Sequence, residues 1–140
     1  MGDDQATELK PVFEASLRRC LAKPEFLMYF YELFLDSSDE VRAKFEGTDF
    51  ARQKQVLRDS FFVLEMLSES TPGSPAWSAV QRLAVTHDRH HRDIRPEHYD
   101  LWLDCLVRSV AEHDPEYTEE VGRAWRESLR TGIDYLVSKY

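Results

Sequence analysis

One stretch of the sequence decides the fold class: WSAVQRLAVTHDRHHRDIRPEHYDLWLDCLVRSV, residues 77–110. On both sides of its polar middle, apolar residues recur at intervals of three and four, which is the spacing of one helix face. The two stripes are Trp77, Val80, Leu83, Ala84 and His87, and then Tyr99, Trp102, Leu103, Leu106 and Val110. Pro96 suits the first turn of the second helix because its φ is already helical. The stretch therefore predicts two amphipathic helices joined by a short polar loop.

The same spacing continues outward in both directions, and alternation of period two is essentially absent. The further stripes are Leu9, Val12, Phe13, Ser16, Leu17, Cys20 and Leu21; Phe26, Phe30, Tyr31 and Phe34; Phe50, Gln53, Leu57, Ser60, Phe61 and Leu64; and Tyr117, Val121, Trp125, Leu129, Ile133 and Leu136. A short helix is expected over residues 39–45. The sequence thus predicts an all-α fold of seven helices, six long and one short, in a single domain over residues 1–140.

Helix-start signals agree with these stripes. Ser37 followed by Glu40 has the spacing of a capping box, in which the serine side chain accepts a backbone N–H of the first turn. Three other places carry a capping side chain, the last two before a proline at the expected first helical position: Thr48-Asp49, Ser74-Pro75 and Asp114-Pro115.

Length, charge and cysteine usage narrow the function classes. A chain of 140 residues suits one compact domain, and a hydrophobic content of 42% excludes wholesale disorder. The formal net charge of −8 argues against broad nucleic-acid binding, which needs a positive surface. No apolar run approaches the roughly 20 residues of a transmembrane helix, and the N-terminal residues lack a signal-peptide core. Cys20 and Cys105 form no disulfide framework, so we expect a cytoplasmic protein with no membrane segment.

The polar middle of the opening stretch concentrates imidazole and guanidinium groups. Residues 86–98 hold four of the five histidines, and residues 82–95 carry four arginines against two aspartates. This local positive charge suits an anionic ligand, although arginines near a helix end also occur simply as solvated partners of the helix dipole. His87 and His91 have the i, i+4 spacing of two zinc ligands on one helix face, so a zinc site at this cluster is an alternative.

Four segments carry a resemblance to one known family: FYELF at 30–34, VRAKF at 41–45, DFARQKQVL at 49–57, and LAVTH at 83–87 with IRPEHY at 94–99. In this order they resemble the second helix, the following phenylalanine segment, the distal helix and the proximal helix of a bacterial single-domain globin, similar to the haem domain of flavohaemoglobins. The resemblance spans nearly the whole chain. It implies a globin fold that encloses haem b (iron protoporphyrin IX).

The resemblance also implies roles for individual residues. His87 matches the proximal histidine that binds the haem iron, and it continues the apolar face of its own helix. The segment from His87 to Pro96 is two residues longer than in typical flavohaemoglobin domains, so His90 is an alternative ligand. Tyr31, Gln53 and Leu57 match the distal side of the haem. The residues expected to pack on the haem are Phe30, Phe45, Phe61, Leu83 and Tyr99.

The residues themselves support a polar distal pair. Gln53 is the polar N-terminal end of an otherwise largely apolar helix face, where its amide can donate a hydrogen bond. Tyr31 lies in an apolar aromatic helix, where a buried hydroxyl needs a partner. Two such donors would slow the release of dioxygen, which carries partial negative charge on haem iron. A core tyrosine bonded to a backbone carbonyl is the simpler interpretation of Tyr31.

The haem propionates are anions and would give the basic segment a partner. Five residues are candidates for this contact: Arg82, Arg89, Arg92, His90 and His91. Lys54 lies one residue off the predicted distal face and is the nearest alternative internal ligand for the iron.

Three function classes follow from the resemblance. The first is reversible dioxygen binding at a five-coordinate haem iron. The second is nitric oxide dioxygenation, which would need a separate reductase because the five glycines form no dinucleotide-binding cluster. The third is gas sensing through a partner protein. We expect dioxygen, nitric oxide and carbon monoxide as small ligands and a monomer or homodimer, and whether the protein is an enzyme stays open.

Overall fold

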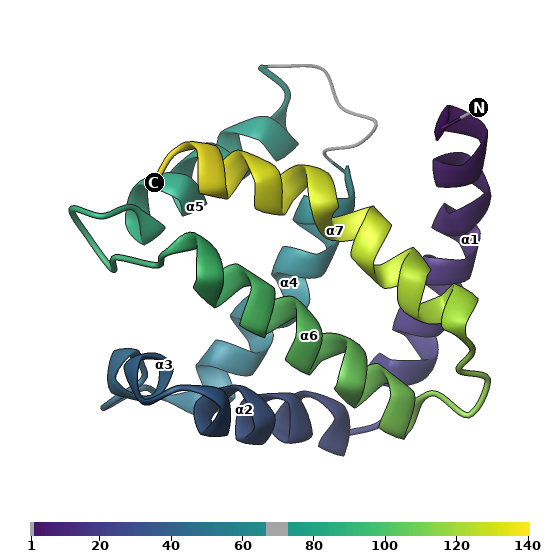
Figure 1. The fold of residues 1–140 in the computed structure, drawn as a ribbon, viewed down its shortest axis with the longest axis horizontal. Coiled ribbons are helices and arrows are strands. Elements are labelled where there is room, and N and C mark those ends of the chain that lie inside the picture. Colours follow the sequence, from purple (N-terminus) through teal and green to yellow (C-terminus); the bar gives the residue numbers. More distant parts are fainter. Residues whose placement is uncertain (1, 67–72) are drawn as a thin grey trace. The chain divides into compact units, whose positions relative to one another are not determined.

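The computed structural model describes residues 2–66 and 73–140, and within them the side chains of 9–66, 73–75 and 77–140. This part of the chain forms seven helices and no strand (Figure 1). They are α1 (Gly2–Leu21), α2 (Glu25–Ser37), α3 (Asp39–Lys44), α4 (Phe50–Met66), α5 (Pro75–His87), α6 (Pro96–His113) and α7 (Glu119–Ser138). The prediction of an all-α fold with one short helix among seven is confirmed.

Two of the predicted caps are present. Asp49 Oδ1 accepts from the backbone N–H groups of Ala51 and Arg52 at 3.1 and 3.4 Å, at the start of α4. Ser74 Oγ accepts from Trp77 N at 3.4 Å, with Pro75 opening α5. Both side chains satisfy amide groups that a helix leaves unpaired in its first turn.

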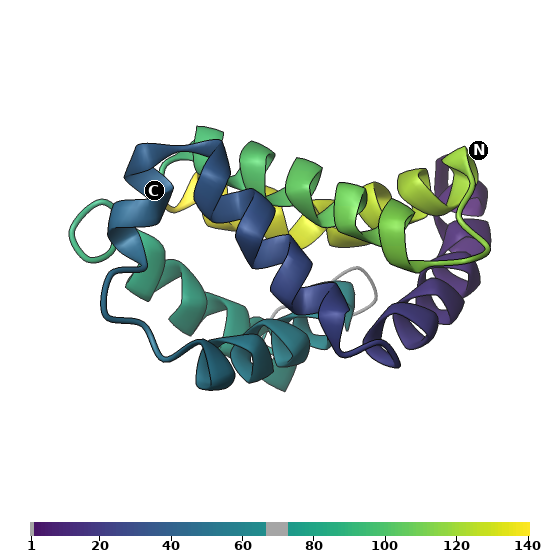
Figure 2. The ribbon, with the colours of Figure 1, turned by 90° about the horizontal axis from the view of Figure 1, so that it is seen from below.

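The other two predicted helix starts were wrong by a few residues. Ser38, not Ser37, caps α3 by accepting from Val41 N, because Ser37 still belongs to α2 and donates back to Phe34 O. Only Ser38 separates the two helices. Figure 2 shows the chain turning between α2 and α3. Asp114-Pro115 does not open α7, which begins at Glu119 after a turn. The Asp114 carboxylate is occupied elsewhere, as described below.

The chain folds into two compact units. One consists of Met1–Phe45 and Leu101–Ser128, and the other of Glu46–Asp100 and Leu129–Tyr140. We call them unit 1 and unit 2. Because the divisions fall inside α6 and α7, each of these helices contributes to both units.

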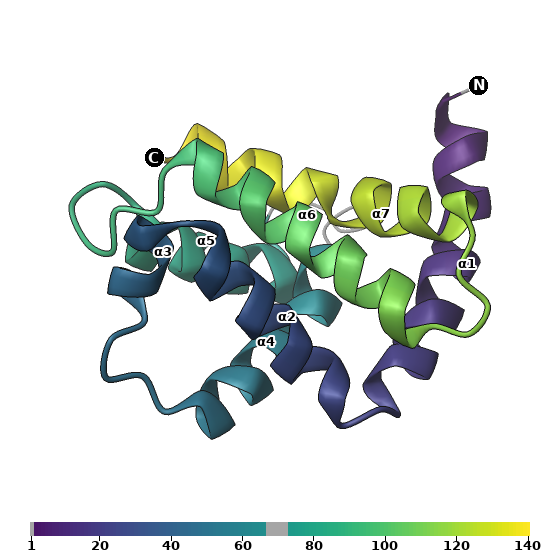
Figure 3. The ribbon, with the colours of Figure 1, turned by 60° about the horizontal axis from the view of Figure 1, so that its bottom comes forward.

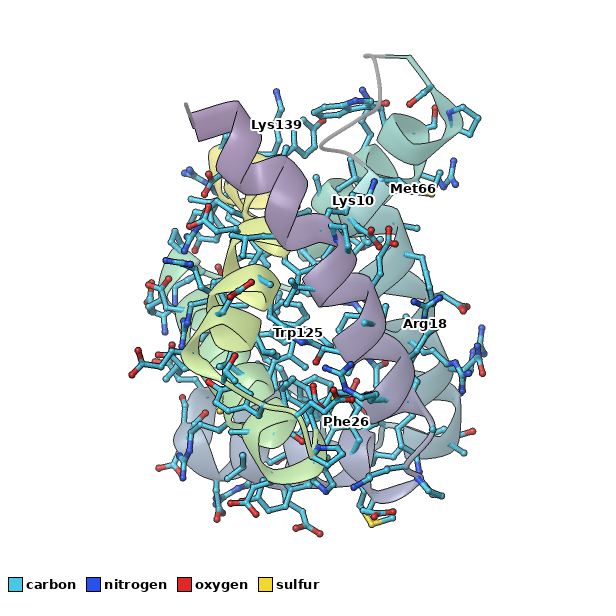
Figure 4. The ribbon with its side chains drawn as sticks, turned by 90° about the vertical axis from the view of Figure 1, so that its right-hand side faces the viewer. Lys10, Arg18, Phe26, Met66, Trp125 and Lys139 are labelled. Atoms are coloured by element: carbon cyan, nitrogen blue, oxygen red, sulfur yellow. The ribbon has the colours of Figure 1, made fainter. Side chains whose placement is uncertain are left out.

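The core of unit 1 is built around three large rings. Phe13 packs edge-on against Trp125 with ring centroids 4.9 Å apart, and Phe26 lies 6.0 Å from the same indole. All three side chains are fully buried. Figure 4 labels Phe26 of α2 and Trp125 of α7, which come together here from segments about 100 residues apart in sequence. Burial of aromatic rings on this scale supplies much of the hydrophobic stabilisation of a small domain.

A buried carboxylate links the segments of unit 1. The side chain of Asp114 is fully buried and accepts four hydrogen bonds: from Ser16 Oγ (2.6 Å), from Arg19 Nε and Nη2 (2.6 and 2.9 Å) and from Glu116 N (2.9 Å). Ser16 in turn accepts from Trp125 Nε1 at 2.9 Å. Burial alone would raise the pKa of Asp114, but the hydrogen bonds from Arg19 and Ser16 outweigh it and hold the pKa below its ordinary value.

Unit 2 has its own apolar core. Phe61 and Leu64 of α4, Val80 of α5 and Leu129 and Ile133 of α7 are all buried. Gly132 lets α7 approach α4 closely, since a Cβ at that position would overlap the Leu64 side chain. The ring of Trp77 meets that of Tyr135 edge-on at 5.3 Å. These contacts bring α4, α5 and α7 together within unit 2 (Figure 3).

None of the helices in the described residues combines the length and the apolar character that crossing a membrane requires.

Replacing Asp114 by Asn should destabilise the protein by about 3 kcal/mol at neutral pH, because Arg19 and Ser16 lose the buried carboxylate that they share. Urea unfolding monitored by circular dichroism measures the change. The folded pKa is depressed, so the carboxylate's contribution is complete above the unfolded pKa near 4 and is lost as the pH falls through the folded pKa. The difference between variant and parent should therefore shrink in acid.

Asp104→Asn is the matched control. Asp104 also pairs with an arginine, at 2.9 Å from Arg126 Nη1, but both side chains are exposed to solvent. Its loss should cost less than about 1 kcal/mol. Equal effects of the two substitutions would mean that the Asp114 cluster has no special role in stability.

Candidate functional site

The hydrogen bonds of His87 determine which nitrogen of its ring carries the proton. His87 is the last residue of α5, and its Nδ1 lies 2.8 Å from Leu83 O and 3.0 Å from Thr86 Oγ1. A carbonyl oxygen can only accept, so Nδ1 carries the hydrogen and Nε2 of the neutral ring keeps a lone pair. The Thr86 hydroxyl donates to the same Leu83 carbonyl at 2.9 Å and so offers its oxygen to Nδ1. This is the tautomer and support that a metal-binding imidazole requires.

The surroundings of His87 also keep its ring neutral. Burial lowers the pKa of His87 below the ordinary histidine value, and the positive charge of Arg92 lowers it further. The hydrogen bond to Leu83 acts in the opposite direction but does not reverse the shift. The neutral imidazole is the form that coordinates iron.

The loop after His87 folds back on the end of α5. Arg92 N donates to Thr86 O at 3.1 Å, and Ile94 N donates to His87 O at 2.9 Å. These amides satisfy carbonyl groups that the helix would otherwise leave unpaired in its last turn. The position of the last turn of α5, which carries His87, therefore depends on the conformation of residues 88–95.

His90 and His91 lie beyond the helix, on the exposed part of this loop. Asp88 Oδ1 accepts from His90 N at 2.9 Å and lies 2.8 Å from His91 Nδ1. Because α5 ends at His87, His91 is not one turn further along the same helix, and the basis for a zinc pair is lost. Among the residues that the structure describes, no three histidine, cysteine, aspartate or glutamate side chains gather as a metal site would require.

The face of α4 in unit 2 matches its sequence pattern. Leu57, Phe61 and Leu64 are buried, while Gln53 and Lys54 near the start of the helix are half-buried. The Ser60 hydroxyl donates to Leu57 O at 2.6 Å and is used within the helix itself. The polar group on this face is therefore at its N-terminal end, as expected.

Unit 1 contains an aromatic cluster around Tyr31. The Tyr31 side chain is buried, and its ring lies 5.0 Å from Phe30 and 5.8 Å from Phe45. Phe34 stacks on Phe30 at 5.4 Å, and Trp102 of α6 meets Phe30 edge-on at 6.3 Å. The cluster holds Phe45, the residue after α3, at 6.0 Å from Phe34. Three of the predicted site residues are thus brought together within this unit.

The predicted propionate partners occupy different settings in unit 2. Arg82 and Arg89 are exposed, and Arg89 Nε donates to the main-chain oxygen of Tyr140 at 3.0 Å. Arg92 is exposed as well, yet its charge acts on His87. Leu83 is half-buried, and Tyr99 is buried, which raises the pKa of its hydroxyl well above the ordinary value.

Sequence reasoning missed His98 and Thr86. His98 is buried, and its Nδ1 accepts from Arg95 N at 2.9 Å, so the third residue of α6 reaches back to the amide before the helix, as Glu or Gln does in a capping box. No standard capping pattern includes histidine, so no signal pointed to it. Thr86 could have been predicted, because it directly precedes His87 and its hydroxyl can therefore reach the ring.

Comparisons with known proteins support the all-α fold. The Globin family model matches residues 29–136. The crystal structure of the protein PA3967 from Pseudomonas aeruginosa PAO1, described as structurally highly homologous to a human haemoglobin, is 39% identical with a TM-score of 0.87, and the match covers 94% of this chain and 98% of that one. No curated protein matches the sequence. The family match spans most of the helices described above, and the chain accordingly belongs to the globin family of haem proteins.

Proposed function

We propose that this globin binds haem b through His87 and reversibly binds dioxygen at a five-coordinate iron, with Tyr31 and Gln53 as distal hydrogen-bond donors. The observation that carries the proposal is the hydrogen bond from His87 Nδ1 to Leu83 O, at 2.8 Å. That arrangement leaves Nε2 as the base, at the position where the globin pattern requires the iron ligand. His90 is exposed and its ring has no comparable support in the loop, which favours His87 over it.

Bound haem would supply a Lewis-acidic iron with one position open to a diatomic gas. The chain's part is to hold the ring plane and to exclude water. Buried or half-buried apolar side chains suit contact with a flat apolar macrocycle, and the proposal assigns this role to Phe30, Phe45, Phe61, Leu83 and Tyr99. Leu57 is assigned the apolar part of the distal side.

The distal donors differ in their surroundings. Tyr31 is buried, and its ring packs against those of Phe30 and Phe45, which orient it. Gln53 comes from the first turn of α4 in unit 2, where its backbone is held by Asp49 O at 2.9 Å. Each donor would hydrogen-bond the partial negative charge of dioxygen and slow its release. Lys54, half-buried beside Gln53, is the proposed alternative ligand when no gas is bound.

The propionates are proposed to meet the basic groups around the 88–95 loop: Arg82, Arg89, Arg92, His90 and His91. Arg92 is favoured among them because its charge already acts on His87. An anion placed there would offset that charge, which otherwise opposes protonation of the ring.

The same pocket would support nitric oxide dioxygenation, in which nitric oxide and dioxygen are combined to nitrate and the iron must be reduced again afterwards. The motivation is the resemblance of the Tyr31 and Gln53 pair to that of flavohaemoglobin haem domains. The proposal includes a separate reductase, because the five glycines of the sequence form no dinucleotide-binding cluster. In this function, Tyr31 and Gln53 retain dioxygen until nitric oxide arrives.

His87→Gly should take up haem poorly, because the ring is the only proposed protein ligand on its side of the iron. Adding imidazole to the solution should restore the Soret band and the carbon monoxide spectrum of the ferrous form. His90→Ala is the comparison variant and should bind haem as the parent does. Haem loss in His90→Ala with retention in His87→Gly would reassign the ligand, and a parent protein with no Soret band after haem addition would refute haem binding.

Tyr31→Phe should raise the dioxygen dissociation rate about tenfold, since it removes one hydrogen bond to dioxygen while it keeps the ring packing. Stopped-flow displacement of dioxygen by carbon monoxide measures this rate. Tyr29→Phe is a matched control on the same helix, because the Tyr29 ring packs 5.2 Å from His113 and not in the Tyr31 cluster. Identical rates for Tyr31→Phe and the parent would place the Tyr31 hydroxyl outside the gas site.

Rapid mixing of the oxygenated protein with nitric oxide separates dioxygenation from simple gas binding. Fast oxidation to the ferric form, with stoichiometric nitrate, is expected, and it should recur only when a reductant is supplied. Tyr31→Phe should lower the yield of nitrate because dioxygen escapes sooner. Slow oxidation with no nitrate would exclude the dioxygenase function while leaving dioxygen binding intact.

A further inference from the structure

Tyr140 contacts the loop after His87 through three different groups. Its main-chain oxygen accepts from Arg89 Nε at 3.0 Å and from Arg89 N at 3.4 Å. The guanidinium carbon of Arg89 lies 5.1 Å from the centre of the Tyr140 ring, within cation–π range. The Tyr140 hydroxyl donates to Asp93 Oδ1. Figures 1 and 3 both place the end of α7 beside this loop.

Asp93 has a backbone conformation that needs outside support. Its φ is +52°, and it is the one non-glycine residue of the described chain with a positive φ. This left-handed conformation costs roughly 1–2 kcal/mol for a residue with a Cβ, although aspartate tolerates it better than most. Asp93 N donates to Asp88 O at 2.8 Å, and the reversal at Asp93 directs the next amide toward α5.

The next amide belongs to Ile94, which donates to His87 O. Tyr140 therefore reaches the last turn of α5 in two steps: its hydroxyl holds the Asp93 side chain, and the Asp93 backbone directs Ile94 N to the carbonyl of His87. Arg89 restrains the first part of the same loop, one residue after Asp88. Tyr140 thus contacts both the first part of the loop, through Arg89, and its second part, through Asp93, which lies 47 residues earlier in the sequence.

We propose that Tyr140 is a positioning residue for His87: by holding Arg89 and Asp93, it keeps the 88–95 loop closed on the end of α5 and so fixes the imidazole toward its ligand. This inference rests on the proposed function, in which His87 binds the iron. It assigns Tyr140 no contact with haem or gas. Opening the loop would free the His87 carbonyl, loosen the last helical turn and weaken the hydrogen bond from Nδ1 to Leu83.

The experiment compares three substitutions in the full-length holoprotein. Tyr140→Phe removes the hydroxyl that Asp93 accepts from and keeps the ring under Arg89. Arg89→Met removes the guanidinium contacts and keeps a side chain of similar length. Tyr135→Phe is the control, because this tyrosine is also on α7 but its ring packs against Trp77 and lies under Lys139.

Three quantities are measured on each variant. Hydrogen exchange of the amides of Arg92, Asp93 and Ile94 reports loop opening. Transfer of haem to excess apomyoglobin gives the rate of haem loss. Resonance Raman spectra of the ferrous, gas-free protein report the iron–histidine stretching frequency. That frequency depends on the orientation and hydrogen bonding of the imidazole, and a purely structural role for Tyr140 would leave it unchanged.

Tyr140→Phe should speed the exchange of these amides and the loss of haem about tenfold each, the effect of one hydrogen bond, and should lower the iron–histidine frequency. Arg89→Met should act in the same direction, and Tyr135→Phe should match the parent. Faster exchange with unchanged haem loss and Raman frequency would overturn the positioning role. Equal changes in Tyr135→Phe would assign the effect to α7 as a whole. A parent that binds no haem would instead refute the proposed function, while the exchange data would still report the Tyr140 contact.

Discussion

The hydrogen bond from His87 Nδ1 to Leu83 O is the constraint on which the proposed haem site depends. It joins a side chain to the carbonyl four residues earlier, so it exists only while α5 remains helical to its last residue. It also forces the proton onto Nδ1 and leaves Nε2 as the base. The proposal that His87 and not His90 binds the iron depends on this tautomer.

What keeps the last turn of α5 helical lies outside the helix. The carbonyls of Thr86 and His87 are capped by amides of the following loop, and that loop reverses at Asp93. A glycine would adopt this conformation with less cost, as glycine does at many helix ends. An aspartate at this position also provides a carboxylate, which accepts a hydrogen bond from the Tyr140 hydroxyl. In the proposed haem site, the loop therefore contributes through its backbone, which supports the last turn of α5.

In unit 1 as well, a carboxylate connects distant parts of the chain. Its rings supply the apolar core, but Asp114 places a charge inside it, and the cost of burying that charge is offset only because four hydrogen bonds reach the carboxylate. The geometry ties α1 to the turn before α7. In both units a carboxylate near the end of a helix organises the chain around it, and in both its most distant partner comes from another part of the sequence.

The sequence by itself determined the helices, their apolar faces and the position of His87 at the end of one of them, because helical periodicity is a local property. It also identified the Asp49 and Ser74 caps, whose partners lie two or three residues away. It could not assign Asp114, which reads locally as a helix cap but binds Ser16 and Arg19 from 98 and 95 residues earlier. It could not assign Tyr140 either. Only the tertiary structure decided these roles, because a hydrogen bond between distant residues depends on where the folded chain places its donor and acceptor, and no periodic pattern records that.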